Sequence, residues 1–260
     1  MRKSLLSLAV LSALSIPTAV FAEEAAAPAA AAPASPHTVT YNVGLFSQYI
    51  FRGLTQTAEK PAIQGGVDYA HASGFYAGAW ASNISWLEDA GAYNNSSLEL
   101  DIYGGYANTI GATGVGYNVG VLQYIYPGDK LSTITADTTE VYGALSYKWL
   151  QGKVSYIVSN DGLAFANATG SYYAELNANY PIGETGITIN AHAGRQKFDG
   201  AALSQASYTD WKIGATKAFS NGVNVGAYYT DTNASRLVWT DATNEYLGDS
   251  TFTAFVQKTF

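Results

Sequence analysis

Short stretches in which apolar and polar residues alternate recur about a dozen times between residues 38 and 260. Residues 98–103 read Leu-Glu-Leu-Asp-Ile-Tyr, so that every apolar side chain is followed by a polar one. The connectors between these stretches are alternately short and long. Strands of a membrane β-barrel face lipid and lumen by turns, and their outer loops are longer than their periplasmic turns. The sequence therefore predicts an all-β, transmembrane, antiparallel, up-and-down barrel of about twelve strands.

The ends of the chain fit this prediction. An even number of strands places both termini on the periplasmic side. The last stretch closes on Phe260 and carries Phe252, Ala254 and Val256 on one face, which we expect to contact outer-membrane lipid and the barrel-insertion machinery. A soluble β-sandwich would also alternate, but its strands are typically about 5–6 residues long. The predicted strands of about 9–11 residues match a bilayer crossing instead.

The first 37 residues are expected to lie outside the barrel. Residues 1–22 have the features of a secretory signal: Arg2 and Lys3, an apolar stretch, and Val20-Phe21-Ala22 as a cleavage site. Residues 23–37 are rich in Ala and Pro and predict a flexible tether. A single domain would then span residues 38–260, in the outer membrane of a Gram-negative bacterium. No other segment has the ~20 apolar residues that a spanning helix needs.

Composition narrows the possible functions. The chain has no cysteine, which excludes disulfides, thiol catalysis and a lipid-modified cysteine. Without Arg2 and Lys3 it holds 11 basic and 20 acidic residues, a net charge near −9 that argues against nucleic acid as a partner. Only 13% of residues are charged, whereas Tyr numbers 20 and Gly 26. Few charges and many tyrosines suit a barrel with aromatic girdles.

A longer pattern covers the first third of the predicted domain. It consists of Phe51-Arg52-Gly53, Gln56-Thr57, Lys60-Pro61-Ala62, Gln64-Gly65-Gly66, Asp68-Tyr69, His71, Ser73-Gly74-Phe75-Tyr76, Gly78, Trp80 and Ser82-Asn83. In this order and spacing the chain resembles the TorF-type family of outer-membrane porin proteins, long classed as conserved hypothetical. The resemblance implies an outer-membrane barrel with a channel role, and it implies no particular substrate.

The alternation assigns a set of side chains to the lumen. The predicted pore-lining residues are Arg52, Gln64, Asp68, Glu99, Asp101, Tyr103, Glu140, Glu175, His192, Asp210 and Lys212, with Lys153 near the periplasmic mouth. Six of these are acidic and three are basic, so that the lumen would favour cations. Alternatively the charges pair across the interior, Arg52 with Asp68 in particular. Twelve strands lie between a filled barrel and an open pore, and we expect a narrow channel for small solutes.

Two other functions stay open. A non-conducting structural or adhesive barrel would act through its outer loops, of which residues 231–249 form the longest and carry Leu237-Val238-Trp239. An outer-membrane lipid esterase would need His71 to activate Ser73, but these residues lie in a predicted periplasmic turn. His192 is expected to be a hydrogen-bonded lining residue. The sequence predicts no catalytic residues, no metal site and no cofactor. Aromatic residues near the short turns predict an interfacial girdle: Phe75, Tyr76, Tyr147, Trp149, Tyr180 and Phe219.

Overall fold

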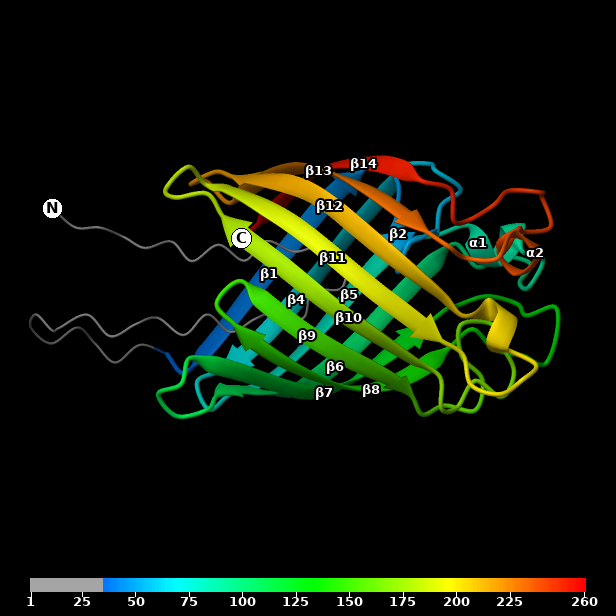
Figure 1. Ribbon diagram of the computed structural model, residues 1–260, viewed down its shortest axis with the longest axis horizontal. Coiled ribbons are helices and arrows are strands. Elements are labelled where there is room, and N and C mark those ends of the chain that lie inside the picture. The colour runs from blue at the N-terminus through cyan, green and yellow to red at the C-terminus, as the bar shows by residue number, and fades with distance from the viewer. Residues whose placement is uncertain (1–34) are drawn as a thin grey trace, which may run out of the picture.

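The strands form one closed antiparallel barrel (Figure 1). The computed structural model describes residues 35–260, so that the predicted signal and most of the predicted tether lie outside the described part. Each strand pairs with its neighbour along the chain, and the first strand closes the barrel against the last. The twelve strands are β1 (His37–Phe46), β4 (Ala62–His71), β5 (Phe75–Asn83), β6 (Leu98–Thr109), β7 (Val115–Ile125), β8 (Thr138–Tyr147), β9 (Leu150–Ile157), β10 (Tyr172–Pro181), β11 (Ile187–Lys197), β12 (Tyr208–Ala218), β13 (Val223–Thr232) and β14 (Thr251–Thr259). The predicted up-and-down barrel of twelve strands is confirmed.

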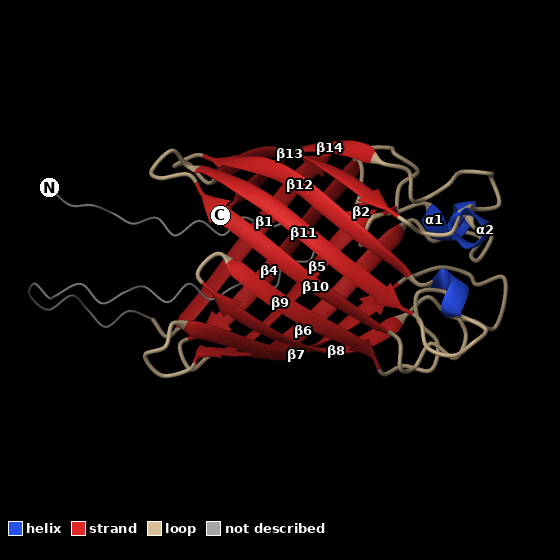
Figure 2. Cartoon of the chain, viewed as in Figure 1, coloured by secondary structure: helices blue, strands red, loops and turns tan. Residues whose placement is uncertain are grey.

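Short turns gather at one end of the barrel and long loops at the other (Figure 2). The C-terminus lies toward the short-turn end (Figure 1), where Phe260 exchanges main-chain hydrogen bonds with Tyr41 of β1. The long loops carry the few helical turns: α1 (Trp86–Asp89), η1 (Ser204–Ala206) and α2 (Arg236–Trp239). Among the described residues, no helix combines the length and apolar character needed to cross a bilayer.

The outer face of the barrel is apolar. Along β1, Val39, Tyr41 and Leu45 are exposed, because their side chains alternate outward. The last strand repeats this pattern, with Phe252 and Val256 exposed on the same face. A wall of exposed aliphatic and aromatic side chains is stable in the hydrocarbon of a bilayer rather than in water. The exterior thus supports the membrane barrel over the soluble sandwich.

Glycines and aromatic rings interlock on the inner face. The Tyr142 ring of β8 lies over Gly120 of β7, where an added Cβ would sit 2.5 Å from Cζ of the tyrosine. Tyr76 lies over Gly105 in the same way. Its hydroxyl donates a 2.6 Å hydrogen bond to Asn118 inside the barrel, so that the predicted place of Tyr76 in an outer girdle is wrong. A glycine on one strand makes room for a ring that the neighbouring strand lays flat against the wall.

The first outer connection contains a small hairpin. The barrel strand β1 ends at Phe46, and a hairpin follows that is made of β2 (Ile50–Phe51) and β3 (Leu54–Thr55). Arg52 and Gly53 form its two-residue turn, with φ angles of 47° and 81°. Such left-handed pairs match the twist of a tight hairpin. The chain therefore reverses at Arg52 instead of extending the barrel strand.

Gly120→Ala tests the interlocking wall. The added methyl group collides with the Tyr142 ring, so that we expect the free energy of unfolding to fall by about 1–3 kcal/mol. Equilibrium urea unfolding of the refolded barrel in lipid vesicles measures this change. Gly143→Ala is the matched control, because no atom lies within 4 Å of its added Cβ. Equal effects of the two substitutions would contradict this packing.

Candidate functional site

The tip of the β2–β3 hairpin lies inside the barrel. The Nη2 atom of Arg52 donates to Oε2 of Glu140 on β8 at 2.8 Å, and Nη1 donates to Oε1 of Gln196 on β11 at 2.8 Å. A longer contact of 3.4 Å joins Nη2 to the Tyr124 hydroxyl on β7. The Arg52 side chain is 7% exposed and that of Glu140 is fully buried. One arginine therefore ties the first outer loop to three strands of the wall.

Aromatic rings complete the surroundings of this guanidinium. The Cζ atom of Arg52 lies 4.7 Å from the centre of the Phe51 ring and 4.4 Å from that of Tyr173 on β10. A planar cation over ring faces adds a cation–π interaction to the ion pair. The predicted pairing of Arg52 with Asp68 is wrong. Asp68 instead accepts a 2.5 Å hydrogen bond from Tyr103, because the hairpin carries Arg52 away from β4.

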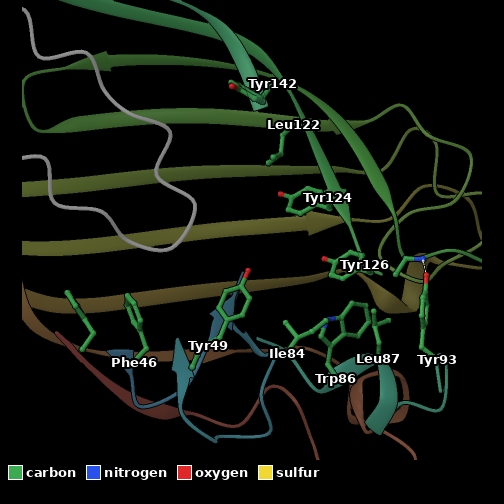
Figure 3. Close-up of a cluster of buried hydrophobic side chains, with 13 residues drawn as sticks. Phe46, Tyr49, Ile84, Trp86, Leu87, Tyr93, Leu122, Tyr124, Tyr126 and Tyr142 are labelled. Carbon is green, nitrogen blue, oxygen red and sulfur yellow. Dashed lines mark hydrogen bonds between the residues drawn. The ribbon is translucent and has the colours of Figure 1, made fainter. Parts of the chain in front are cut away.

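The stem of the hairpin is anchored to the wall and to other loops. Tyr49 is fully buried and donates a 2.9 Å hydrogen bond to Oε1 of Glu99 on β6. In Figure 3 the Tyr49 side chain rises toward Tyr124 and Tyr126, which reach over from the facing part of the barrel. Main-chain bonds of 2.8 Å run from the amide of Thr55 to Leu247 and from that of Ser85 to Gln56. The first loop thereby lies inside the barrel, at the outer ends of the strands that it contacts.

The other outer loops close over the hairpin. Leu54 of β3 packs into a buried cluster with Phe198, Tyr208, Trp239 and Leu247. Trp239 comes from the long last loop, and its indole donates to the Ala206 carbonyl at 3.1 Å. Of the apolar segment Leu237-Val238-Trp239 that the sequence singles out in this loop, Trp239 packs inward. The neighbouring Leu237 points out and is 84% exposed.

Two buried carboxylates beside the hairpin have no cation as a partner. Glu99 and Asp101 lie two residues apart on the inner face of β6 and are 1% and 0% exposed. Within residues 35–260 neither carboxylate has a basic group in ion-pair contact. Both oxygens of Asp101 and the Oε1 atom of Glu140 also lack a hydrogen-bond donor in this part of the chain. Buried charge of this kind is costly unless something neutralises it.

The charges on β9 to β12 are mostly paired. Lys153 lies 3.7 Å from Glu175, and the His192 ring lies between Glu175 at 3.6 Å and Asp210 at 3.0 Å. Asp210 also accepts a 2.9 Å hydrogen bond from the Tyr173 hydroxyl. In this part of the interior the inward charges pair with one another, which is the alternative to an unpaired acidic lining. His192 is a hydrogen-bonded wall residue, and among the described residues no group of three metal-ligating side chains is close enough to hold an ion.

The predicted inner residues lie where the alternation placed them. Gln64, Glu99, Asp101, Glu140 and Asp210 are buried inside the barrel. The side chains that are only partly buried there are Asp68, Tyr103, Glu175, His192 and Lys212. Arg52 is also inside, but it enters from the loop. The structure adds four residues that the sequence analysis missed: Tyr49, Tyr124, Tyr173 and Gln196. Strand alternation would have found the last three, whereas Tyr49 depends on the inward fold of the loop.

His71 and Ser73 meet, but as part of a local turn. The Nδ1 atom of His71 lies 2.6 Å from the Ser73 hydroxyl and accepts a 3.1 Å hydrogen bond from the Ser73 amide. These bonds close the tight turn between β4 and β5 at the short-turn end. No carboxylate within ion-pair reach orients the His71 ring in the described part of the chain. The geometry is that of a turn cap and supplies no third group for an esterase.

The buried ion pair can be tested with an exposed pair in the same chain. Arg52→Met leaves Glu140 buried without its partner, and we expect a loss of about 3–5 kcal/mol in unfolding free energy. The control is Arg236→Ala, because Arg236 meets Asp249 at 2.6 Å with side chains 67% and 52% exposed. That substitution should cost about 0–1 kcal/mol.

A double-mutant cycle with Glu140→Gln isolates the interaction itself. The Arg52→Met/Glu140→Gln protein should be more stable than the sum of the two single effects predicts, since the second change removes the stranded charge. Urea unfolding of the refolded proteins gives all four values. Additive effects would mean that the ion pair does not anchor the hairpin.

Known structures share this fold. The KdgM porin aligns with a TM-score of 0.51 and 9% identity over 85% of this chain and 98% of that one. A second structure, KdgM porin in complex with disordered oligogalacturonate, aligns with the same values. The outer membrane protein OprD from Pseudomonas aeruginosa aligns over 85% of this chain and 65% of its own, with 15% identity and a TM-score of 0.37. At these identities the KdgM structures show a common fold alone.

Sequence comparison places the chain in a family without assigning it an activity. No curated protein matches it. The profile of the Gcw_chp family, described as a bacterial protein of unknown function, matches residues 30–260. The predicted likeness to the TorF-type porins stays a prediction, since this description carries no such name. The chain belongs to the Gcw_chp family of bacterial proteins.

Proposed function

We propose that this protein is a narrow outer-membrane channel for passive diffusion of small solutes, described here in its closed state. The observation that carries this proposal is the hairpin, whose polar tip binds the wall through Arg52 and Glu140. A barrel that served only as a scaffold needs no inserted loop with a buried charge at its tip, because an apolar filling of equal volume is often at least as stable. A hairpin that is held in the lumen by polar contacts can move out to open the channel and move back to close it.

The location follows from the barrel's surface. Exposed residues such as Leu45 and Phe252 would contact the hydrocarbon of an outer membrane. The last strand, which ends beside Phe260, would serve as the contact for barrel insertion. The porin fold of the KdgM structures supports the same location and the same class of function. The residues on the inner face would line the solute path, and none of them is proposed to be catalytic.

The inner charges favour cations in this proposal. The predicted lining residues, all of them in the described part of the chain, include six acidic and three basic side chains, and Glu99 and Asp101 lack a basic partner in that part. An acidic lining raises the local concentration of cations and repels anions. Selectivity would therefore arise near β6, while the paired charges of β9 to β12 contribute less.

A non-conducting barrel that acts through its loops is the second candidate. It is favoured by the apolar cap, in which Trp239 and Leu247 are buried while Leu237 is 84% exposed. Such a protein would use the closed loop surface for contact and would keep its lumen permanently filled. Electrical measurements separate the two candidates.

Arg52→Ala is the first test of the channel. The refolded wild-type protein in a planar bilayer should open rarely, whereas Arg52→Ala should raise the open fraction about tenfold or more, because a loss of about 1.4 kcal/mol in hairpin anchoring is already a tenfold shift. Stepwise single-channel currents provide the measurement. A correctly folded Arg52→Ala barrel that passes no current would favour the loop-contact function.

The acidic lining has its own test. We expect Glu99→Gln/Asp101→Asn to weaken the preference for K⁺ over Cl⁻, since the substitutions remove two inward carboxyl groups that have no basic partner in the described chain. The reversal potential in a KCl gradient measures the preference. Glu184→Gln is the control, because Glu184 lies exposed in a short turn. If both proteins shift equally, the selectivity does not depend on β6.

A further inference from the structure

The barrel wall around Arg52 is a complete binding site for a guanidinium group. Glu140 supplies a carboxylate at 2.8 Å, Gln196 an amide oxygen at 2.8 Å, and Tyr173 a ring face at 4.4 Å. These wall residues come from β8, β11 and β10, so that the strands hold them in place whether or not the loop is present. In the structure the site is occupied by the guanidinium of Arg52, a residue of the first outer loop.

Unused acceptors surround this site. The Oε1 atom of Glu140 is buried and has no hydrogen-bond donor among residues 35–260, and the same holds for both oxygens of Asp101. Asp101 is directly opposite Tyr124 in the strand register, and Tyr124 reaches Glu140 at 3.3 Å. One arginine therefore neutralises only part of the negative charge near the hairpin tip. A second cation would be attracted to the same place.

We propose that this wall site recognises the guanidinium group of a solute, and that Arg52 is a tethered competitor that occupies it in the closed state. Transport of such a solute rests on the proposed channel function. Binding at the wall site does not depend on that function. A tethered group is present at an effective concentration of the order of mM. A solute must therefore compete with Arg52, and its binding would release the hairpin tip from Glu140.

The chemistry of the site favours a planar organic cation over a metal ion. Metal ions need several ligands at short distance, and the described residues bring together no such group of three. The flat face of Tyr173 and the separated oxygens of Glu140 and Gln196 fit a guanidinium, which stacks on rings and donates in several directions. The solute class is thus an alkylguanidinium.

The experiment removes the Arg52 side chain by substitution and then offers the site a soluble guanidinium. Refolded Arg52→Ala is titrated with methylguanidinium in a calorimeter and in a planar bilayer, and neutral methylurea of the same shape is the control ligand. We expect methylguanidinium to bind Arg52→Ala at least about tenfold more tightly than wild type, because the tethered competitor is gone. It should also reduce the current through Arg52→Ala. Methylurea should do neither.

Further variants separate the possible outcomes. Arg52→Ala/Glu140→Gln should lose the binding at least about tenfold, since a charge-assisted bond is replaced by a neutral one. Equal binding to both variants, or no binding to Arg52→Ala, would overturn the proposed site. Binding without current in any variant would uphold the site and overturn the channel. The heat-dependent gel shift of a folded barrel checks folding, and Arg52→Gln replaces Arg52→Ala if the latter fails to refold.

Discussion

A guanidinium buried inside a β-barrel must find a carboxylate, and Arg52 finds Glu140 on the inner wall at 2.8 Å. In the proposed closed channel, the other contacts of the first loop depend on this pair. It fixes the tip of the β2–β3 hairpin, which in turn brings Tyr49 against Glu99 and seats Leu54 beneath the outer loops. If one partner of the pair is removed, the other charge stays buried without a counter-ion, and the free energy of the inserted hairpin rises.

The wall is shaped to receive this hairpin. Inward glycines such as Gly120 let aromatic rings lie flat against the strands, which keeps large side chains from crossing the lumen. The same arrangement leaves the Tyr173 ring face free for the Arg52 guanidinium at 4.4 Å. Twelve strands enclose a space between a filled core and an open pore, and the β2–β3 hairpin lies within it against β6, β8 and β11.

Much of this architecture could be predicted from the sequence, because strand alternation is a local property. Residues 98–103 assign Glu99 and Asp101 to the lumen without any knowledge of the fold. The turn at Arg52 could not be predicted in this way, since Phe51-Arg52-Gly53 continues the pattern of an extended strand. Its partners are also remote: Glu140 and Gln196 follow 88 and 144 residues later. Contacts across a lumen depend on the closed barrel, and alternation alone does not determine them.

The place of the hairpin can be measured directly, because the chain has no cysteine of its own. Leu54 of the hairpin is 3% exposed, whereas Leu237 of the last loop is 84% exposed. In the refolded barrel, Leu54→Cys should therefore react with a membrane-impermeant maleimide far more slowly than Leu237→Cys, and adding Arg52→Ala should speed the reaction of Leu54→Cys. If Leu54→Cys reacts as fast as Leu237→Cys, or if Arg52→Ala leaves its rate unchanged, the ion pair does not hold the hairpin in the lumen.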